Sequence, residues 1–201
     1  MTSIGSTTRK TAALAILLLS AAAAQAHTGH GTSSLAEGLS HPFGLDHMLA
    51  MVAVGIWSVS ALPQGKAWWG PLTFMAALVV SAALGASGVT LPYVEHMVSI
   101  SVVVFGAMLV LSRVRLPLAM GLGVVALAAS MHGLAHGAET PASGFAGYAA
   151  GFLLTTAALH VGGVLAGVGL RRYVSAQAVT LTQTLGGLCS GAGLYLLHQL
   201  S

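Results

Sequence analysis

Long apolar stretches alternate with short polar breaks along most of the chain beyond Ser40. The breaks are rich in Pro, Gly or Arg, and the stretches approach or exceed the roughly 20 helical residues that cross a bilayer. Six such segments occur, at 41–62, 67–87, 94–112, 116–135, 144–170 and 176–200. The pattern predicts an all-α membrane protein whose domain at 41–201 is a compact bundle of six transmembrane helices.

The apolar stretch at residues 12–24 has a different character. Arg9 and Lys10 precede it, it is too short to span a bilayer, and a small-x-small sequence, Ala-Gln-Ala, follows it. These features are typical of a secretory signal peptide. We expect cleavage of residues 1–26, so that a short periplasmic segment at 27–40 opens the mature chain; the alternative is an uncleaved anchor helix.

The composition supports a lipid environment. Of the 201 residues 56% are hydrophobic and only 5% are charged, and the mean hydropathy is +0.87. A soluble domain has about a quarter of its residues charged. The net charge of +3 rests on so few groups that it gives no support for nucleic-acid binding. A single cysteine, Cys189, excludes an intramolecular disulfide and a thiolate cluster.

The charged residues indicate an orientation for the bundle. Beyond the predicted signal peptide, every Lys and Arg lies in the connections at 63–66, 113–115 and 171–172. The positive-inside rule places these connections in the cytoplasm. The acidic residues lie near the opposite ends of the predicted helices. With six spans, the mature N-terminus and the C-terminus are both expected outside, in the periplasm.

Small residues recur at a spacing that suits close packing of helices in lipid. Such stripes mark the faces through which membrane helices associate. We expect four of them to lie at helix–helix contacts: Gly121 and Gly123, Gly147 and Gly151, Gly163 and Gly167, and Gly187 and Gly191.

Histidine and carboxylate residues gather where the predicted helices reach the outer surface. An ionisable side chain inside a bilayer costs about 2.5–3.5 kcal/mol, so one that persists usually faces the bundle interior and has a partner. The first cluster contains His41, Asp46 and His47. Because Asp46 and His47 point about 100° apart on a helix, a third ligand must come from His41 or from another helix.

The second cluster lies at the outer end of the fourth predicted segment. His132, His136 and Glu139 are spaced i, i+4 and i+7, which places them on one face if the helix continues that far. Gly137 could instead end the helix before Glu139. The less specific interpretation, polar residues that cap helices at the interface, explains one such cluster comfortably but not both.

Further ionisable residues extend this pattern. Glu95 and His96 open the third predicted segment, and the combination of imidazole and carboxylate donors favours a divalent ion such as Ni, Co, Cu, Zn or Fe. His160 lies deeper and is either a second station on a transport path or a histidine bonded to a backbone carbonyl. His27 and His30 could collect metal at the mature N-terminus, or belong to a disordered tail.

The two motifs resemble the signatures of the HupE/UreJ family of nickel and cobalt permeases. The first runs from His41-Pro42 to Asp46-His47 and continues as Met48-Leu49-Ala50-Met51, the second runs from His132-Gly133 to Glu139, and the similarity extends over nearly the whole chain. The resemblance implies transport of Ni²⁺ or Co²⁺ across the bacterial inner membrane for urease or hydrogenase maturation, with the ion as substrate and no permanent cofactor. It carries the metal-handling role to His41, Asp46, His47, His132, His136 and Glu139.

The first motif departs from the family signature by one residue. The signature has two residues between Pro and Gly, whereas Phe43 alone separates Pro42 from Gly44 here. On a continuous helix this would rotate His41 by about 100° relative to Asp46. A loop through the intervening residues would absorb the shift.

Two other functions are compatible with the same donors. A zinc-dependent hydrolase within the membrane would use a similar ligand set, and an accessory protein would bind metal without conducting it. The chain has no Gly-x-x-x-x-Gly-Lys-Ser/Thr loop, so it is not expected to hydrolyse nucleotide. The motifs favour a secondary transporter over an enzyme.

Overall fold

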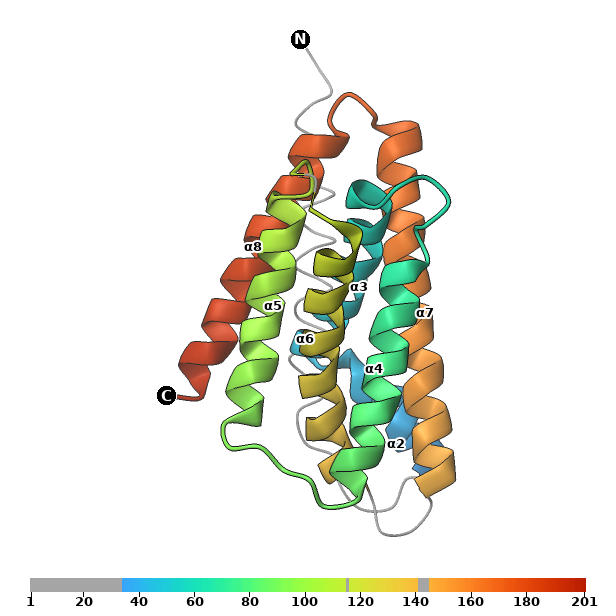
Figure 1. The fold of residues 1–201 in the computed structure, drawn as a ribbon, viewed down its shortest axis with the longest axis vertical. Helices are drawn as coiled ribbons and strands as arrows, with labels where there is room; N and C mark the ends of the chain where they lie inside the picture. The colour runs from blue at the N-terminus through green and yellow to red at the C-terminus, as the bar shows by residue number, and fades with distance from the viewer. Residues whose placement is uncertain (1–33, 115, 141–144) are drawn as a thin grey trace.

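The computed structural model describes residues 34–114, 116–140 and 145–201, and this part of the chain is entirely helical (Figure 1). The predicted signal peptide and the histidines His27 and His30 lie outside the described residues. The all-α class is therefore confirmed for the described part. Its helices are α2 (Ser34–Ser40), the 3₁₀ helix η1 (His41–Phe43), α3 (Leu45–Ala61), α4 (Trp69–Ala86), α5 (Val94–Val110), α6 (Leu118–Ala138), α7 (Phe145–Tyr173) and α8 (Ala178–Gln199).

Six of these helices, α3 to α8, coincide with the six apolar segments predicted from the sequence. Among the described residues, α4, α6 and α7 are each long and apolar enough to cross a membrane. The segment α2–η1 and α3 together would make a fourth span, bent by 72°, and α5 is a shorter apolar helix. The structure thus supports a helical membrane protein with three or four spans by this criterion, and six crossings stay a prediction.

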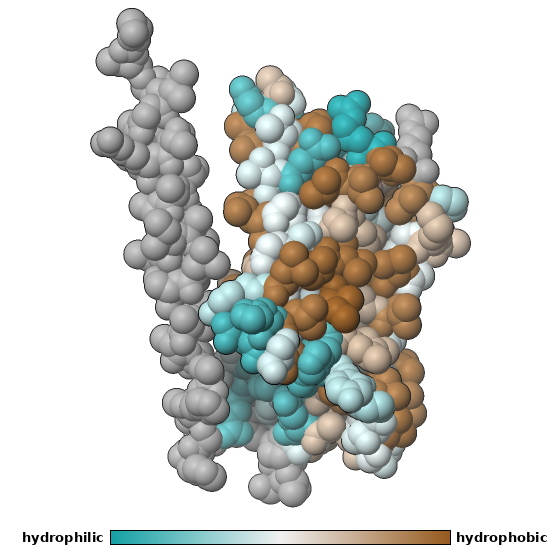
Figure 2. All heavy atoms as spheres, turned by 90° about the vertical axis from the view of Figure 1, so that its left-hand side faces the viewer, coloured by the Kyte–Doolittle hydropathy of each residue, from teal (hydrophilic) through white to brown (hydrophobic). Residues whose placement is uncertain are grey.

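Large apolar side chains cover the outside of the bundle as well as its interior. Leu72, Leu127 and Leu188 expose 64%, 68% and 65% of their surface. On the face formed by α5 and α8, apolar atoms form a band across the middle, with hydrophilic residues gathered above and below it (Figure 2). An apolar surface of this extent is unfavourable in water and suits contact with lipid.

The first predicted span is broken at Gly44. Pro42 lies in the first turn of η1, and the backbone of Gly44 is extended, with φ −51° and ψ 141°, before α3 begins. The prediction of a continuous helix over 41–62 is therefore wrong in the first turn. The alternative, an interruption between His41 and Asp46, is the correct one. Helix α2 packs instead on α7, where the Thr155 hydroxyl donates a hydrogen bond to the Leu39 carbonyl oxygen at 2.9 Å.

Glycines allow the closest helix pairs to approach. A Cβ atom on Gly163 of α7 would lie 2.5 Å from the carbonyl oxygen of Val52 on α3, and one on Gly55 would lie 2.7 Å from the carbonyl oxygen of His160. Gly137 of α6 faces the backbone of α4 equally closely. These contacts fix α3 against α7 and α6 against α4, and these helices carry the buried histidines His47, His132 and His160.

The predicted glycine stripes have mixed outcomes. Gly163 and Gly167 do face α3, as expected. The prediction for Gly187 and Gly191 is wrong within the described residues, because no other atom lies within 4 Å of an added Cβ at either position. Helix α8 turns a different face to α5, with Gly186 in contact there. Spacing alone does not distinguish the packed face of a glycine-rich helix from its exposed one.

Charge is separated along the bundle. Lys66 and Arg113 lie in the α3–α4 and α5–α6 connections, and Arg171 and Arg172 lie in the last turn of α7. These connections and the end of α7 are at the upper end in Figure 1. The four acidic residues of the chain lie on α2, at the starts of α3 and α5 and at the end of α6, in the lower half of that view. The bundle thus has an acidic end and a basic end.

We predict that Gly163→Ala lowers the thermal unfolding midpoint of the protein in detergent. The added methyl group would overlap the backbone of α3, and such overpacking costs about 1–3 kcal/mol. The matched control is Gly162→Ala, because that neighbouring position is exposed and has no atom within 4 Å. Equal midpoints for the two variants would show that the α3–α7 contact is not tight.

Candidate metal site

The six residues predicted to handle metal lie together at the acidic end of the bundle. Helix α6 continues through Gly137 to Ala138 with Glu139 as its C-cap, so the predicted stripe of one helical face is confirmed. The donors form two groups that share His136. We call them the outer group, His41, His136 and Glu139, and the inner group, His47, His132 and His136. Asp46 lies beside the inner group.

The outer group is accessible. Nε2 of His41 lies 2.7 Å from Nδ1 of His136, which in turn lies 3.1 Å from Oε2 of Glu139. The distance from His41 Nε2 to that carboxylate oxygen is 3.6 Å, and the Glu139 side chain is about half exposed at 52%. Two nitrogens and one carboxylate oxygen therefore form a compact triangle that is open to solvent. The break at Gly44 turns His41 into this position despite the shortened motif.

The inner group is buried. His47 is 1% exposed and His132 is fully buried, and Nε2 of His47 lies 3.2 Å from Nδ1 of His132. The Ser101 hydroxyl of α5 donates to the Val98 carbonyl oxygen at 2.6 Å, so its oxygen accepts a hydrogen bond from Nε2–H of His132 at 2.7 Å. This arrangement assigns the proton of His132 to Nε2 and leaves a lone pair on Nδ1.

Asp46 sets the corresponding tautomer of His47. Its Oδ1 accepts a hydrogen bond from the backbone N–H of His47 at 2.7 Å and lies 3.5 Å from Nδ1 of the same residue. A carboxylate beside Nδ1 favours a proton on that nitrogen and leaves a lone pair on Nε2.

Two lone pairs therefore face each other across 3.2 Å between His47 and His132. They repel unless a cation or an additional proton lies between them. Adjacent nitrogens bound to one ion at about 2.1 Å are roughly 3 Å apart. The spacing of this pair thus suits a single transition-metal ion.

His136 links the two groups. Its Nδ1 faces the outer partners, whereas its Nε2 is buried and has no hydrogen-bond partner among the described residues. An unsatisfied buried nitrogen is costly, and a bond to a metal ion would offset that cost. The donors of the inner group lie within 4.8 Å of one another, so the three imidazoles can serve one ion.

Aromatic side chains of α7 enclose these histidines. The ring centroid of Phe152 lies 5.8 Å from that of His41, 5.9 Å from that of His47 and 5.5 Å from that of His136. Tyr148, one turn earlier, lies 5.7 Å from His41, and its hydroxyl is buried without a partner in the described part of the chain. The rings exclude water from one side of the site and restrict the orientation of the imidazoles.

Sequence reasoning missed Phe152, Tyr148 and Ser101. An aromatic residue in an apolar helix has no feature that separates a site wall from a lipid-facing position. Ser101 carried a weak signal, a hydroxyl within an apolar segment, but most such hydroxyls bond only to their own helix. Its second hydrogen bond, to His132 on another helix, depends on how α5 and α6 pack.

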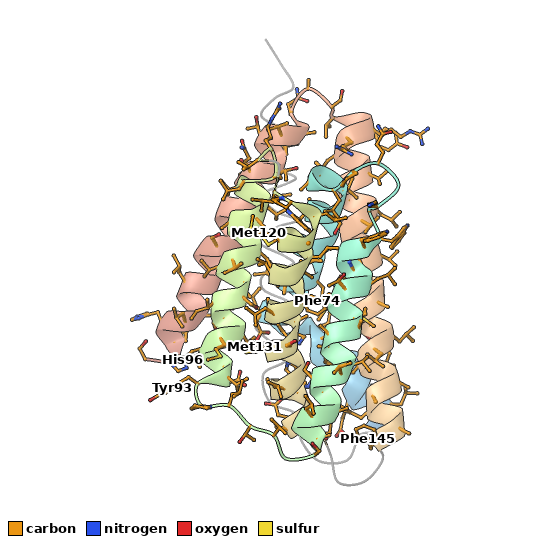
Figure 3. The ribbon with its side chains drawn as sticks, in the orientation of Figure 1. Phe74, Tyr93, His96, Met120, Met131 and Phe145 are labelled. Atoms are coloured by element: carbon orange, nitrogen blue, oxygen red, sulfur yellow. The ribbon has the colours of Figure 1, made fainter. Side chains whose placement is uncertain are left out.

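His160 lies apart from both groups. It is 1% exposed, its Nδ1–H donates to the Thr156 carbonyl oxygen at 2.9 Å, and its Nε2 has no partner among the described residues. Phe74, near the middle of the bundle, contacts both this ring and that of His132, with centroid separations of 4.8 Å and 5.7 Å (Figure 3). The expected carbonyl bond is present, and a free nitrogen remains on the buried side chain.

Glu95 and His96, at the start of the third predicted segment, are not part of either group. Glu95 is exposed in the first turn of α5. The ring of His96 packs edge-on against Tyr93 with a centroid separation of 5.5 Å, and both lie at the outer edge of the bundle, away from Phe74 (Figure 3). The role of Glu95 and His96 on a transport path stays a prediction.

The carboxylate of Glu139 remains ionised over a wide pH range. The hydrogen bond from His136 is the largest influence on it and lowers the pKa of Glu139 below its usual value, against the opposing effect of partial burial. The outer group therefore keeps a negative charge beside its two imidazoles at neutral and mildly acidic pH.

The fold and this site define a helical membrane protein with a histidine and carboxylate site that is suited to a transition metal. The sequence matches the family described as HupE / UreJ protein over residues 14–196, and the chain belongs to that family. It is also similar to the protein described as "Protein HupE" of Rhizobium leguminosarum bv. viciae, with 41% identity over 176 residues, which is 87% of this chain and 90% of that protein. No solved structure matches the chain.

We predict that Ser101→Ala weakens binding of a transition-metal probe, Ni²⁺, at the candidate site about tenfold, because the hydroxyl orients the buried His132 and fixes its tautomer. Isothermal titration calorimetry in detergent measures the affinity. Ser130→Ala is the control, since that hydroxyl bonds only to the Ala126 carbonyl oxygen of its own helix. An unchanged affinity in Ser101→Ala would show that this hydroxyl does not orient His132 for metal binding.

Proposed function

We propose that this chain carries Ni²⁺ or Co²⁺ into the bacterial cytoplasm as a secondary transporter that does not hydrolyse nucleotide. The observation that carries the proposal is the pair of donor groups joined by His136, one open to solvent and one buried within an apolar bundle. Its proposed role is to supply hydrogenase or urease maturation, which agrees with family membership and with the similarity to the protein described as Protein HupE.

Capture begins at the outer group. The acidic end attracts a hydrated cation, and Glu139 supplies a fixed negative charge at an exposed position. His41 and His136 then replace part of the hydration shell. Because two imidazoles and one carboxylate suit a borderline divalent ion better than Mg²⁺ or Ca²⁺, this step selects for transition metals.

Transfer to the inner group uses the shared imidazole. His136 binds the ion through Nδ1 on the outer side. The buried Nε2 of the same ring then offers a ligand as the ion moves inward. His47 and His132 present lone pairs that Asp46 and Ser101 hold in place. Each step exchanges one or two ligands, so protein ligands never fill the whole coordination shell of the ion. The ion is therefore bound weakly enough to leave again.

The remaining path runs along α3 and α7 toward the basic end. Phe74 separates the inner group from His160, whose free Nε2 offers a single weak ligand deeper in the bundle. The excess of Lys and Arg at the basic end supports a cytoplasmic location for that end by the positive-inside rule. The direction from the acidic to the basic end is therefore inward.

We predict that His47→Ala and Asp46→Asn each reduce ⁶³Ni²⁺ uptake into proteoliposomes at least tenfold. The first change removes a buried ligand, and the second removes the carboxylate that sets its tautomer. His198→Gln is the control, because it changes an exposed histidine in the last turn of α8 and leaves both donor groups intact.

The same vesicles separate the alternatives. A transporter exchanges external label for internal nickel, whereas a zinc-dependent hydrolase or a non-conducting metal-binding protein gives no counter-flow. Binding without exchange in the unmodified protein would contradict the proposal.

We predict that uptake declines as the external pH falls from about 7.5 to about 5.5, since protons compete with metal for the imidazole ligands. The lowered pKa of Glu139 keeps its carboxylate charged throughout this window, so loss of that charge does not cause the decline. The assay uses a clamped membrane potential and a fixed concentration of free Ni²⁺. Uptake that stays flat over this range would count against ligation by histidine.

A further inference from the structure

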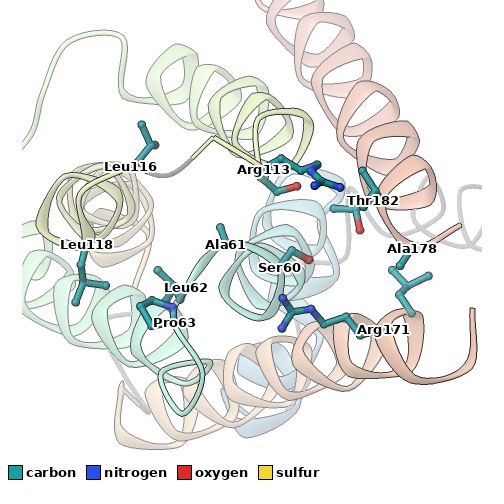
Figure 4. Close-up of a pocket in the computed structure, with 14 residues that line it drawn as sticks. Ser60, Ala61, Leu62, Pro63, Arg113, Leu116, Leu118, Arg171, Ala178 and Thr182 are labelled. Atoms are coloured by element: carbon teal, nitrogen blue, oxygen red, sulfur yellow. The ribbon is translucent and has the colours of Figure 1, made fainter. Parts of the chain in front are cut away.

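The basic end of the bundle contains a cavity of about 670 Å³ (Figure 4). Its walls come from the last turn of α3, the α5–α6 connection, the last two turns of α7 and the start of α8. The volume falls within the range of sites that hold small molecules. None of the residues that coordinate metal in the proposed function line this cavity.

Two guanidinium groups and three hydroxyl groups line the cavity. Arg113 and Arg171 enter from opposite sides, with Ser60 and Thr182 between them in Figure 4. Ser112 contributes a further hydroxyl, and Ser112 and Thr182 are 8% and 3% exposed. A guanidinium presents a planar set of N–H donors that matches phosphate or carboxylate oxygens, and the hydroxyls add donors on the remaining side.

No side-chain carboxylate is available to neutralise these arginines. The whole chain has only four acidic residues, and all of them lie toward the opposite end of the bundle. The ion pairs found among the described residues involve histidines and lie at that acidic end. Arg113 and Arg171 thus leave uncompensated positive charge around a concave space beside low-dielectric helices, which raises the local concentration of anions.

Two helix N-termini add to the positive potential. Leu118, the first residue of α6, and Ala178, the first residue of α8, both line the cavity. The first N–H groups of a helix lack partners within the helix, and its dipole favours a negative charge at this end. Charge, hydrogen-bond donors and helix dipoles therefore all favour the same kind of occupant.

We propose that this cavity binds a phosphate-type oxyanion between Arg113 and Arg171. The phosphate belongs either to a soluble polyvalent phosphate or to the headgroup of an anionic lipid, and the recognition chemistry is the same for both. The bound anion also removes an obstacle to release of the ion into the cytoplasm under the proposed function, because a divalent cation that reaches the basic end otherwise meets two uncompensated guanidinium groups. Anion binding itself is independent of nickel transport and is testable on the metal-free protein.

The test uses the full chain, freed of metal with EDTA and reconstituted in nanodiscs of neutral phosphatidylcholine. Pyrophosphate is the soluble probe, and calorimetry measures its affinity. In a second arm, native mass spectrometry counts the phosphatidylglycerol retained from mixed nanodiscs. We expect Arg113→Gln with Arg171→Gln to weaken binding of at least one probe tenfold or more.

Arg172→Gln is the matched control. Arg172 carries the same charge next to Arg171, but its guanidinium packs over the Tyr173 ring at 5.5 Å and does not line the cavity. We expect less than a twofold change in this variant. Thr182→Val, which removes a buried hydroxyl without altering charge, is expected to weaken binding at least threefold and tests the cavity independently of the arginine variants.

The outcomes are distinct. Arginine-dependent binding of pyrophosphate in neutral nanodiscs supports a soluble phosphate, and arginine-dependent retention of phosphatidylglycerol alone supports a lipid headgroup. If neither probe distinguishes the arginine pair from Arg172→Gln, the charge acts only as a general surface attraction and the proposal is overturned. Because no nickel is present, failure of this test leaves the proposed transport function intact. Equally, a failure of the transport assays does not bear on anion binding by the cavity.

Discussion

The facing nitrogens of His47 and His132 are the constraint on which the acidic half of the bundle depends. They lie 3.2 Å apart, both are buried, and their outward partners, Asp46 and Ser101, leave a lone pair on each. Such a pair is unfavourable in hydrocarbon without a cation or proton between the nitrogens. The surrounding helices must therefore be held firmly, and close contacts at glycines of α3, α6 and α7 provide that rigidity.

The two ends of the bundle offer opposite chemistry. At one end imidazoles and carboxylates are arranged for a cation, and at the other Arg113 and Arg171 surround a cavity without any acidic partner. The first arrangement suits entry of a divalent cation. The second suits a bound anion at the end of the bundle where the cation would leave. The same axial charge separation is the pattern from which the positive-inside rule predicts the orientation of a membrane protein.

Much of this organisation was predictable from local patterns. Helices α3 to α8 lie where the apolar segments predicted them, and the i, i+4, i+7 spacing correctly placed His132, His136 and Glu139 on one face. The break at Gly44 was one of two alternatives, and only the structure decided between them. The glycine stripe on α8 misled because identical spacing occurs on lipid-facing and packed surfaces.

The sequence by itself determined the apolar helices, the separation of charge and the choice of candidate metal donors, because these follow from composition and from periodicity within single segments. Tertiary structure alone decided that His136 belongs to two groups, that Ser101 holds His132, and that two arginines from separate segments share one cavity. These relations depend on the rotation and depth of one helix against another. Side-chain packing sets both quantities, and no local spacing encodes them.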